Sequence, residues 1–343
     1  MEKKFLLIGK LRSVSNPTNA GGVIVLFEQL INNFNERGAN FRIIDLNNRN
    51  YLIKFFSVII IYVKLLFAIP KMDVIFFNGT AGEYKFYSWY VVLISKVFGK
   101  KIILRKFAGN FHEFYEEKFN FFSKGLVRYA LKNADINYFE TKYLISYFKS
   151  IAKNTKWFPN VRVKPPMINS KIYSKKFIFL GHVNNDKGIT EILKAKRDLG
   201  EEYTIDIFGS KKYDCPVFLK TEFDSAYKGL LSSKEVIKTL FKYDVLLLPT
   251  FHKGEGYPGV IIEALSIGIP VIASPLKGVR EMIQNYKSGI FVEPKNHEDL
   301  IEKIKSIDFE NHKTLSKGAL RAFESFNSDI VMKRIFNEIK NIA

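Results

Sequence analysis

Short apolar runs alternate with longer amphipathic segments along the first half of the chain. The short runs are typical of buried strands, and they lie at 5–9, 41–45, 74–77, 102–104 and 136–139. Helix-length segments occupy 23–34, 51–69, 84–97, 124–132 and 143–151. Strands that alternate with helices in this way predict a parallel sheet covered by helices on both faces.

The pattern breaks at 159–170, where Pro165 and Pro166 cannot continue a helix, and we interpret this segment as an interdomain linker. The alternation then restarts. Predicted strands lie at 177–180, 203–208, 244–248 and 271–273, and predicted helices at 189–199, 234–241, 260–267, 298–307 and from about 312 onward. We therefore expect two α/β domains, 1–165 and 166–325. The helical tail, 326–343, either docks on the first domain or caps the second.

Composition agrees with two domains. A chain of 343 residues with 47% hydrophobic residues has ample material for two cores. The single cysteine, Cys215, excludes a disulfide framework and fits a reducing cytosol. The first apolar run has strand length, so no secretory signal is expected.

The formal charge of +19 is concentrated in the first half. Residues 1–165 hold 26 Lys and Arg against 11 Asp and Glu, whereas residues 166–343 hold 27 against 23. A lysine-rich proteome would explain a basic chain, but it should affect both halves alike. The asymmetry favours an anionic membrane surface or a phosphate-bearing acceptor as a partner.

The most apolar window is 51–69. Its longest charge-free run, 55–63, is too short to span a bilayer, and Lys54 and Lys64 flank it. Two interpretations remain open: a core helix of the first domain, or an interfacial helix whose lysines reach toward lipid phosphates.

The segment 255–263, Glu-Gly-Tyr-Pro-Gly-Val-Ile-Ile-Glu, places two carboxylates on either side of a turn between the 244–248 strand and the next helix. In an open α/β sheet this is the crevice where ligands bind. With the Ala264–Ala273 continuation, Glu281 and the Ser288-Gly289 turn, it resembles the E-x7-E motif of retaining glycosyltransferases of family 4. The resemblance covers about 177–305.

The resemblance implies the GT-B fold: two doubly wound Rossmann-like domains that face each other across a cleft, with a C-terminal helix crossing back. Glu255 would lie against the donor sugar, where a carboxylate accepts hydroxyl hydrogen bonds and offsets developing positive charge. Gly256, Tyr257 and Gly259 form a turn whose N–H groups open a helix toward phosphate. The resemblance implies that Glu263 binds the ribose hydroxyls.

A second candidate phosphate site is the 181–188 loop, which follows the 177–180 strand. In similar sequences an Arg and a Lys of this loop pair with the donor diphosphate. Lys187 matches the Lys, but His182 stands at the Arg position and is only partly charged at neutral pH. Gly209, after the 203–208 strand, resembles the Gly that borders the base pocket, although a plain strand-end turn explains it equally well.

In the first half, Gly21 and Gly22 follow Asn19-Ala20 in a loop that resembles the family's Gly-Gly loop near the donor phosphate and acceptor. Arg105 and Lys106 are expected to meet an acidic acceptor. Many relatives carry a histidine after the fourth strand; that position is not histidine here, and His112 is a candidate substitute from a shifted location.

No metal site is expected, because the five histidines form no i,i+4 pair and no Asp-x-Asp is present. The chain also lacks the G-x-G-x-x-G of dinucleotide-binding folds and any aromatic-basic motif for nucleic acid.

We therefore predict a retaining, metal-independent hexosyltransferase-type enzyme that needs no cofactor. It would move a sugar from a nucleotide-sugar donor to a saccharide or lipid-carrier-linked acceptor in bacterial surface polysaccharide biosynthesis. The expected location is cytoplasmic, at the inner face of the plasma membrane. The alternatives are a nucleotide-sugar epimerase of the same fold and a non-catalytic protein that binds membrane or phosphate.

Overall fold

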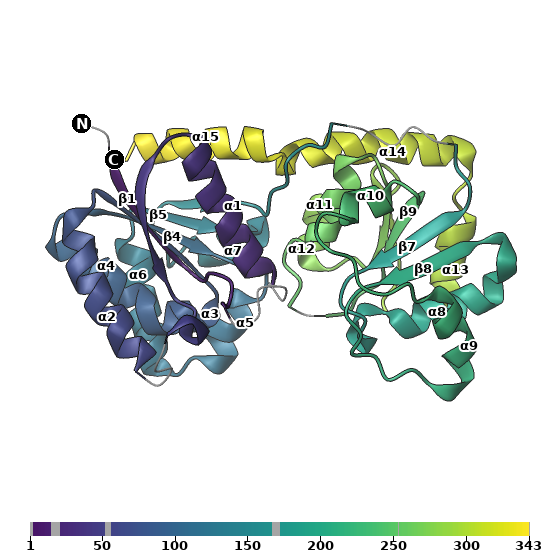
Figure 1. Ribbon diagram of the computed structural model, residues 1–343, viewed down its shortest axis with the longest axis horizontal. Helices are drawn as coiled ribbons and strands as arrows, with labels where there is room; N and C mark the ends of the chain where they lie inside the picture. The colour runs from purple at the N-terminus through teal and green to yellow at the C-terminus, as the bar shows by residue number, and fades with distance from the viewer. Residues whose placement is uncertain (1–2, 15–20, 52–55, 167–171, 253, 343) are drawn as a thin grey trace. The chain divides into compact units, whose positions relative to one another are not determined.

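The computed structural model describes residues 3–14, 21–51, 56–166, 172–252 and 254–342, and the chain forms two compact units (Figure 1). Unit 1 comprises Met1–Asn160 and Met332–Ala343, and unit 2 comprises Val161–Val331. Parts of the predicted 51–69 helix and of the predicted linker lie outside the described residues, as does Asn19-Ala20.

Unit 1 is built on a parallel sheet with strand order β2-β1-β3-β4-β5-β6. The strands are β1 (Lys4–Gly9), β2 (Asn40–Asp45), β3 (Val74–Gly79), β4 (Lys101–Lys106), β5 (Ile136–Phe139) and β6 (Thr155–Trp157). All five predicted strands are confirmed. The sixth, β6, is a short edge strand whose three residues are only half-buried, so it carries no apolar run to predict it.

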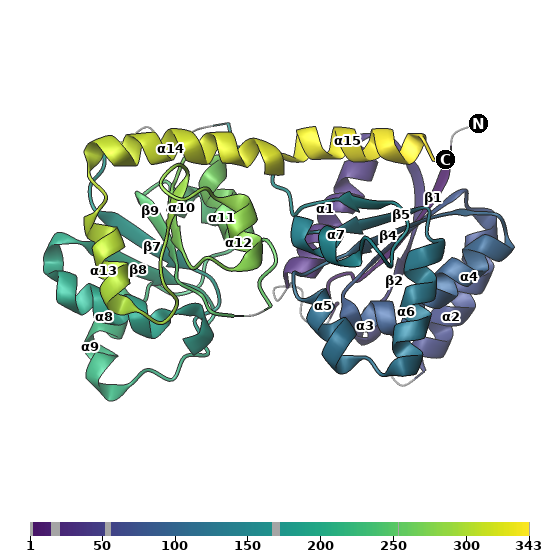
Figure 2. The same cartoon turned by 180° about the vertical axis from the view of Figure 1, so that it is seen from behind.

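Helices cover both faces of this sheet. They are α1 (Gly22–Glu36), α2 (Ser57–Ala68), α3 (Ala81–Glu83), α4 (Trp89–Val97), α5 (Phe111–Glu113), α6 (Phe121–Asn133) and α7 (Lys142–Phe148). On one face α2, α4 and α6 lie side by side over a core that includes Leu6 and Ile8 (Figures 1 and 2). On the other face, Phe34 of α1 makes edge contacts with Phe5 and Phe76.

The C-terminal helix α15 (Ser328–Lys340) returns to unit 1. Its Phe336 ring lies 4.8 Å from that of Phe34, and Glu338 accepts a hydrogen bond of 2.7 Å from the Tyr138 hydroxyl. The single long tail helix expected from about residue 312 is wrong: α14 (Phe309–Phe323) ends in the 3-10 turn Glu324–Phe326, after which Asn327 is extended.

Unit 2 has a second parallel sheet, of order β11-β10-β9-β7-β8. Its strands are β7 (Lys176–Leu180), β8 (Thr204–Phe208), β9 (Val245–Leu248), β10 (Val271–Ala273) and β11 (Gly289–Phe291). The helices are α8 (Ile189–Leu199), α9 (Lys220–Ala226), α10 (Val236–Leu240), α11 (Gly259–Ser266), α12 (Lys277–Met282), α13 (His297–Lys305) and α14. Helix α8 packs with α13, and α11 with α10 and α14. The four predicted strands of this half are confirmed.

Among the described helices, none combines the length and the apolar character needed to cross a bilayer.

Candidate functional site

Two loops meet at the carboxyl edge of the unit 2 sheet. One follows β7 and the other follows β9, and these strands are parallel neighbours, so both loops leave the sheet at the same edge. Lys187 of the first loop forms an ion pair with Glu255 of the second. The two side chains are only 13% and 15% exposed. The structure therefore brings the predicted lysine and the predicted sugar-facing carboxylate together.

Asp186 fastens the two loops to each other. Its carbonyl accepts hydrogen bonds from the Phe251 N–H (2.9 Å) and from the Thr250 hydroxyl (3.2 Å). Its carboxylate lies 2.6 Å from Nδ1 of His252. These contacts hold Lys187, the next residue, against the second loop. Sequence reasoning missed Asp186, because nothing in the order of residues shows that its partners lie more than sixty positions away.

Gly188 allows the loops to approach this closely. It has φ of +76°, and a Cβ at this position would lie 2.4 Å from the Pro249 carbonyl oxygen. Both the left-handed backbone and the close contact exclude larger residues. The glycine that closes the 181–188 loop therefore sets the distance between the two loops.

The Lys187 ammonium is partly removed from water. Burial lowers the pKa of Lys187, while the neighbouring Asp186 carboxylate acts in the opposite direction. A desolvated cation interacts more strongly with an anion than an exposed cation does. Lys187 is therefore suited to bind a second anionic group, such as a phosphate, in addition to Glu255.

The turn after Glu255 leads directly into α11, as predicted, and α12 packs close to it. A Cβ at Gly278 would lie 2.0 Å from the Gly256 carbonyl oxygen, so only glycine permits this approach. The Tyr257 ring is buried edge-on against Phe326, with centroids 5.5 Å apart, and its hydroxyl donates to Glu281. The side chain of Tyr257 thus anchors the turn that leads into α11.

Glu263, on α11, forms an ion pair that the sequence did not predict. Its Oε1 accepts a hydrogen bond of 2.7 Å from Nε of Arg162, and both side chains are largely buried. The backbone of Arg162 is itself fixed, because its N–H donates to the Phe326 carbonyl and its carbonyl accepts from the Ser328 N–H. Arg162 therefore holds Glu263 in one orientation.

His182 lies beside Ser210, with its Nδ1 2.6 Å from the hydroxyl oxygen. Burial lowers the pKa of His182, and the positive charges of Lys187 and Lys212 lower it further. The ring is therefore mostly neutral at pH 7. It can donate or accept a hydrogen bond, but it does not replace the permanent charge of an arginine.

Gly209 lies where the end of β8 meets the 181–188 loop. Its φ is +143°, and a Cβ there would lie 1.6 Å from the Gly181 carbonyl oxygen. Its N–H donates to the Gly229 carbonyl over 2.9 Å. Close packing against Gly181 therefore requires glycine at position 209.

In unit 1 the structure buries Arg105 and Lys106, which are 2% and 1% exposed. The Arg105 guanidinium carbon lies 3.4 Å from the centroid of the Phe158 ring, and Lys106 Nζ lies 4.6 Å from that of Phe111. Lys106 also donates to the Phe107 carbonyl. The expectation that both residues meet an acidic acceptor did not anticipate this burial, in which the rings of Phe158 and Phe111, from outside the sheet, pack against the two cations at the end of β4.

We expect Lys106 to make stability depend on pH. Burial lowers its pKa from 10.5 to about 7, although Glu140 and Glu83 act in the opposite direction. Between about pH 7 and 10.5 the unfolded chain binds more protons than the folded chain at this site, so stability rises with pH across this window. The free energy of unfolding, measured at pH 7 and at pH 10, should rise less between these two values for Lys106→Met than for the unchanged protein. An equal rise in the two proteins would contradict this prediction.

His112 lies in an aromatic environment on α5. Its ring centroid is 4.8 Å from that of Tyr143 and 5.5 Å from that of Tyr147.

Gly21 caps α1, and its carbonyl accepts the Ile24 N–H over 3.0 Å. Among the residues that the structure describes, none would lie within 4 Å of a Cβ at Gly21.

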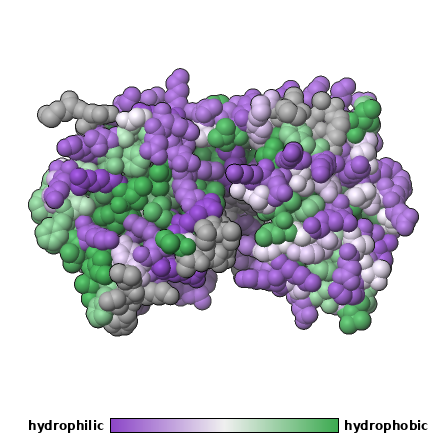
Figure 3. All heavy atoms as spheres, viewed as in Figure 1, coloured by the Kyte–Doolittle hydropathy of each residue, from purple (hydrophilic) through white to green (hydrophobic). Residues whose placement is uncertain are grey.

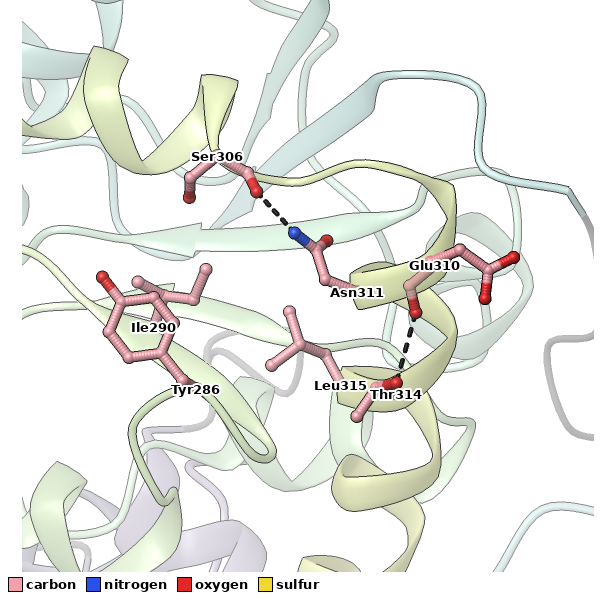
Figure 4. Close-up of a pocket in the computed structure, with 7 residues that line it drawn as sticks. All are labelled: Tyr286, Ile290, Ser306, Glu310, Asn311, Thr314 and Leu315. Atoms are coloured by element: carbon pink, nitrogen blue, oxygen red, sulfur yellow. Dashed lines mark hydrogen bonds between the residues drawn. The ribbon is translucent and has the colours of Figure 1, made fainter.

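Within the described parts of the chain, no three His, Cys, Asp or Glu residues are grouped as metal ligands. A pocket of about 270 Å³ lies between β11 and the start of α14 (Figure 4). Asn311, in its lining, caps α14, and Thr314 donates to the backbone of the same helix. This pocket contains none of the predicted site residues.

The two units, each with a parallel sheet and helices, define the GT-B class of fold. The solved structure of Anabaena HepE in complex with UDP superimposes with a TM-score of 0.74 at 13% identity, over 98% of this chain and 100% of that one. The predicted fold class is thereby confirmed.

Residues 167–313 match the family model described as "Glycosyl transferases group 1". Lys187, Glu255 and Glu263 all lie inside this match, so the predicted resemblance of this segment to glycosyltransferases is confirmed. Assignment to the retaining family 4, with its E-x7-E motif, stays a prediction.

Curated relatives match about half of the chain. Sulfoquinovosyl transferase SQD2 of Arabidopsis thaliana is 27% identical over 167 residues, 47% of this chain and 32% of that protein. The N,N'-diacetylbacillosaminyl-diphospho-undecaprenol α-1,3-N-acetylgalactosaminyltransferase of Campylobacter jejuni is 25% identical over 209 residues, 55% of this chain and 52% of that protein. The chain thus spans between about a third and a half of these relatives.

Proposed function

We propose that this protein is a retaining, metal-independent glycosyltransferase. It transfers a sugar from a nucleotide-sugar donor to a saccharide or lipid-carrier-linked acceptor, in bacterial surface polysaccharide biosynthesis. The group 1 match over unit 2 supports the reaction class. The UDP in a structure of the same fold and the diphospho-undecaprenol in the name of one relative support the kinds of donor and acceptor.

The observation that carries the proposal is the ion pair between Lys187 and Glu255 at the carboxyl edge of the unit 2 sheet. A nucleotide sugar carries a diphosphate next to a hydroxyl-rich ring, so its site needs a cation and a hydroxyl acceptor side by side. Lys187 supplies the first and Glu255 the second. Glu263, oriented by Arg162, is available to accept hydrogen bonds from the two ribose hydroxyls.

In the proposed reaction the bond between the anomeric carbon and the diphosphate oxygen breaks, and the acceptor hydroxyl oxygen forms the new bond. Lys187 stabilises the charge that develops on the departing diphosphate, and Glu255 offsets the positive charge at the anomeric carbon. The acceptor proton passes to the departing phosphate oxygen on the same face of the sugar. Attack from that face retains the anomeric configuration and requires no separate general base.

A panel of nucleotide sugars in a thermal-shift assay tests donor binding. A ligand that binds only the folded state at a hundred times its Kd adds about 2.7 kcal/mol of stability. At least one donor should therefore raise the Tm by several degrees, and without added metal. Transfer is then assayed with that donor and membrane-extracted lipid-linked acceptors. If no donor shifts the Tm, the proposed function is wrong.

Lys187→Ala is expected to remove most of the donor-dependent rise in Tm, because the diphosphate loses a partly buried cation. We expect a loss of roughly 2 kcal/mol of donor binding, about thirtyfold in Kd. Lys175→Ala is the matched control, since Lys175 also pairs with a glutamate in unit 2, but on an exposed surface at the start of β7. A Lys187→Ala protein that binds the donor as well as the control would contradict the assignment.

A further inference from the structure

Helix α2 exposes an apolar face. Its Ser57, Ile61 and Leu65 point into the core of unit 1, whereas Ile59, Val63, Leu66 and Phe67 are between 39% and 65% exposed. The positions 59, 63, 66 and 67 follow the i, i+4, i+7, i+8 spacing of one helical face. Helix α2 is therefore apolar on two faces, and only one of them is used by the fold.

Neighbouring elements extend this apolar face. Leu93 and Val97 are exposed on α4, which packs beside α2, and Phe86 is exposed in the segment just before α4. The hydroxyl of Tyr62 in α2 donates to the Phe86 carbonyl and joins the two elements. Figure 3 shows apolar residues gathered over α2 and α4. We call these seven side chains, of residues 59, 63, 66, 67, 86, 93 and 97, the α2/α4 surface.

The charge around the α2/α4 surface is positive. Residues 56–101 contain six lysines and two acids, and one of these lysines, Lys96, pairs with Asp135. Both acids are engaged elsewhere: Asp73 accepts from the Lys4 N–H over 2.8 Å, and Glu83 is buried and pairs with Lys10. Lys64, on α2 itself, and Lys71, just after it, are both exposed.

We propose that the α2/α4 surface docks on an anionic lipid bilayer. Large contiguous apolar surfaces mark interaction sites, and an apolar helical face with lysines beside it fits the boundary between lipid headgroups and acyl chains. The apolar side chains enter this boundary, and the lysine ammonium groups reach the lipid phosphates. The two interpretations of segment 51–69, core helix and interfacial helix, thus describe opposite faces of α2. This docking does not rest on the proposed transferase activity, because its residues lie in unit 1 and the donor residues in unit 2.

Flotation of the 343-residue chain with vesicles tests this proposal. The protein should float with vesicles of phosphatidylcholine and phosphatidylglycerol, and much less with phosphatidylcholine alone. The double variant Val63→Asp, Phe67→Asp should bind the anionic vesicles at least roughly tenfold more weakly, because two charged side chains replace inserted apolar ones. Lys64→Gln, Lys71→Gln should weaken binding to the anionic vesicles and reduce its dependence on salt.

The control is Val217→Asp, Phe218→Asp, which changes two exposed apolar residues of unit 2 and should leave flotation unchanged. The Tm of each variant, measured without donor, checks that it is folded, so the test of docking holds whether or not a nucleotide sugar binds. Absence of flotation for the unchanged protein, or equal flotation of the Asp variant and the control, would overturn the proposal. The α2/α4 surface could instead join two copies of the chain. Light scattering would then show a dimer for the unchanged protein and a monomer for the Asp variant, and neither protein would bind vesicles. That result would also overturn the docking proposal.

Discussion

Glu255→Gln is expected to lower turnover in the transfer assay by roughly a thousandfold, while the protein remains folded. Removing one preorganised electrostatic contact to a transition state costs about 2.7–4 kcal/mol. Glutamine keeps the size and one hydrogen-bond acceptor of Glu255, so the two loops stay joined through Asp186 and Gly188. The measurement is the rate of sugar transfer at saturating donor, beside the Tm of the same sample.

Glu202→Gln is the matched control, because Glu202 also pairs with a lysine but is exposed. It should keep full activity. The donor-dependent thermal shift of Glu255→Gln should persist, since Lys187 and Glu263 remain. If turnover is unchanged while donor binding is intact, Glu255 does not act on the reacting sugar and the site assignment is wrong.

The sheets of both units could be predicted from the sequence because buried parallel strands consist of nearly continuous apolar residues. β7 and β9 are examples, because the apolar runs 177–180 and 244–248 match these strands to within one residue. The break between α14 and α15 could not be predicted, since Glu-Ser-Phe-Asn contains neither glycine nor proline. The break depends on tertiary contacts: the Phe326 carbonyl accepts from the Arg162 N–H, and the Phe326 ring packs on Tyr257.

Some features of the candidate site could also be predicted from the sequence, and others could not. Lys187 and Glu255 could be placed together because each follows a strand, and the loops after adjacent parallel strands leave the same edge. The pairing of Arg162 with Glu263 could not be predicted, because it joins residues 101 positions apart. The burial of Lys106 could not be predicted either, since a lysine at the end of an apolar strand is normally expected at the surface.

Gly209→Ala is expected to destabilise the protein by about 3 kcal/mol or more and to abolish the donor-dependent thermal shift. Two costs add at this position. Alanine is strained at φ of +143°, and its Cβ would lie 1.6 Å from the Gly181 carbonyl oxygen, a distance that requires the backbone to move. That movement would displace Gly181, and with it the loop that carries His182 and Lys187.

Gly200→Ala separates these two costs. Gly200 has φ of +69° and also lies outside the right-handed region, but a Cβ there would meet nothing within 4 Å. Its ψ of −160° places it in a backbone region that is nearly exclusive to glycine, so Gly200→Ala should lose about 1–3 kcal/mol from backbone strain alone and keep its response to donor. Unfolding by urea measures both variants. Equal losses of stability would mean that backbone strain alone acts at Gly209, and that the contact with Gly181 does not position the phosphate loop. A larger loss in Gly209→Ala, together with a lost donor response, would show that the fold of unit 2 and its affinity for the donor depend on the same close approach of two backbones.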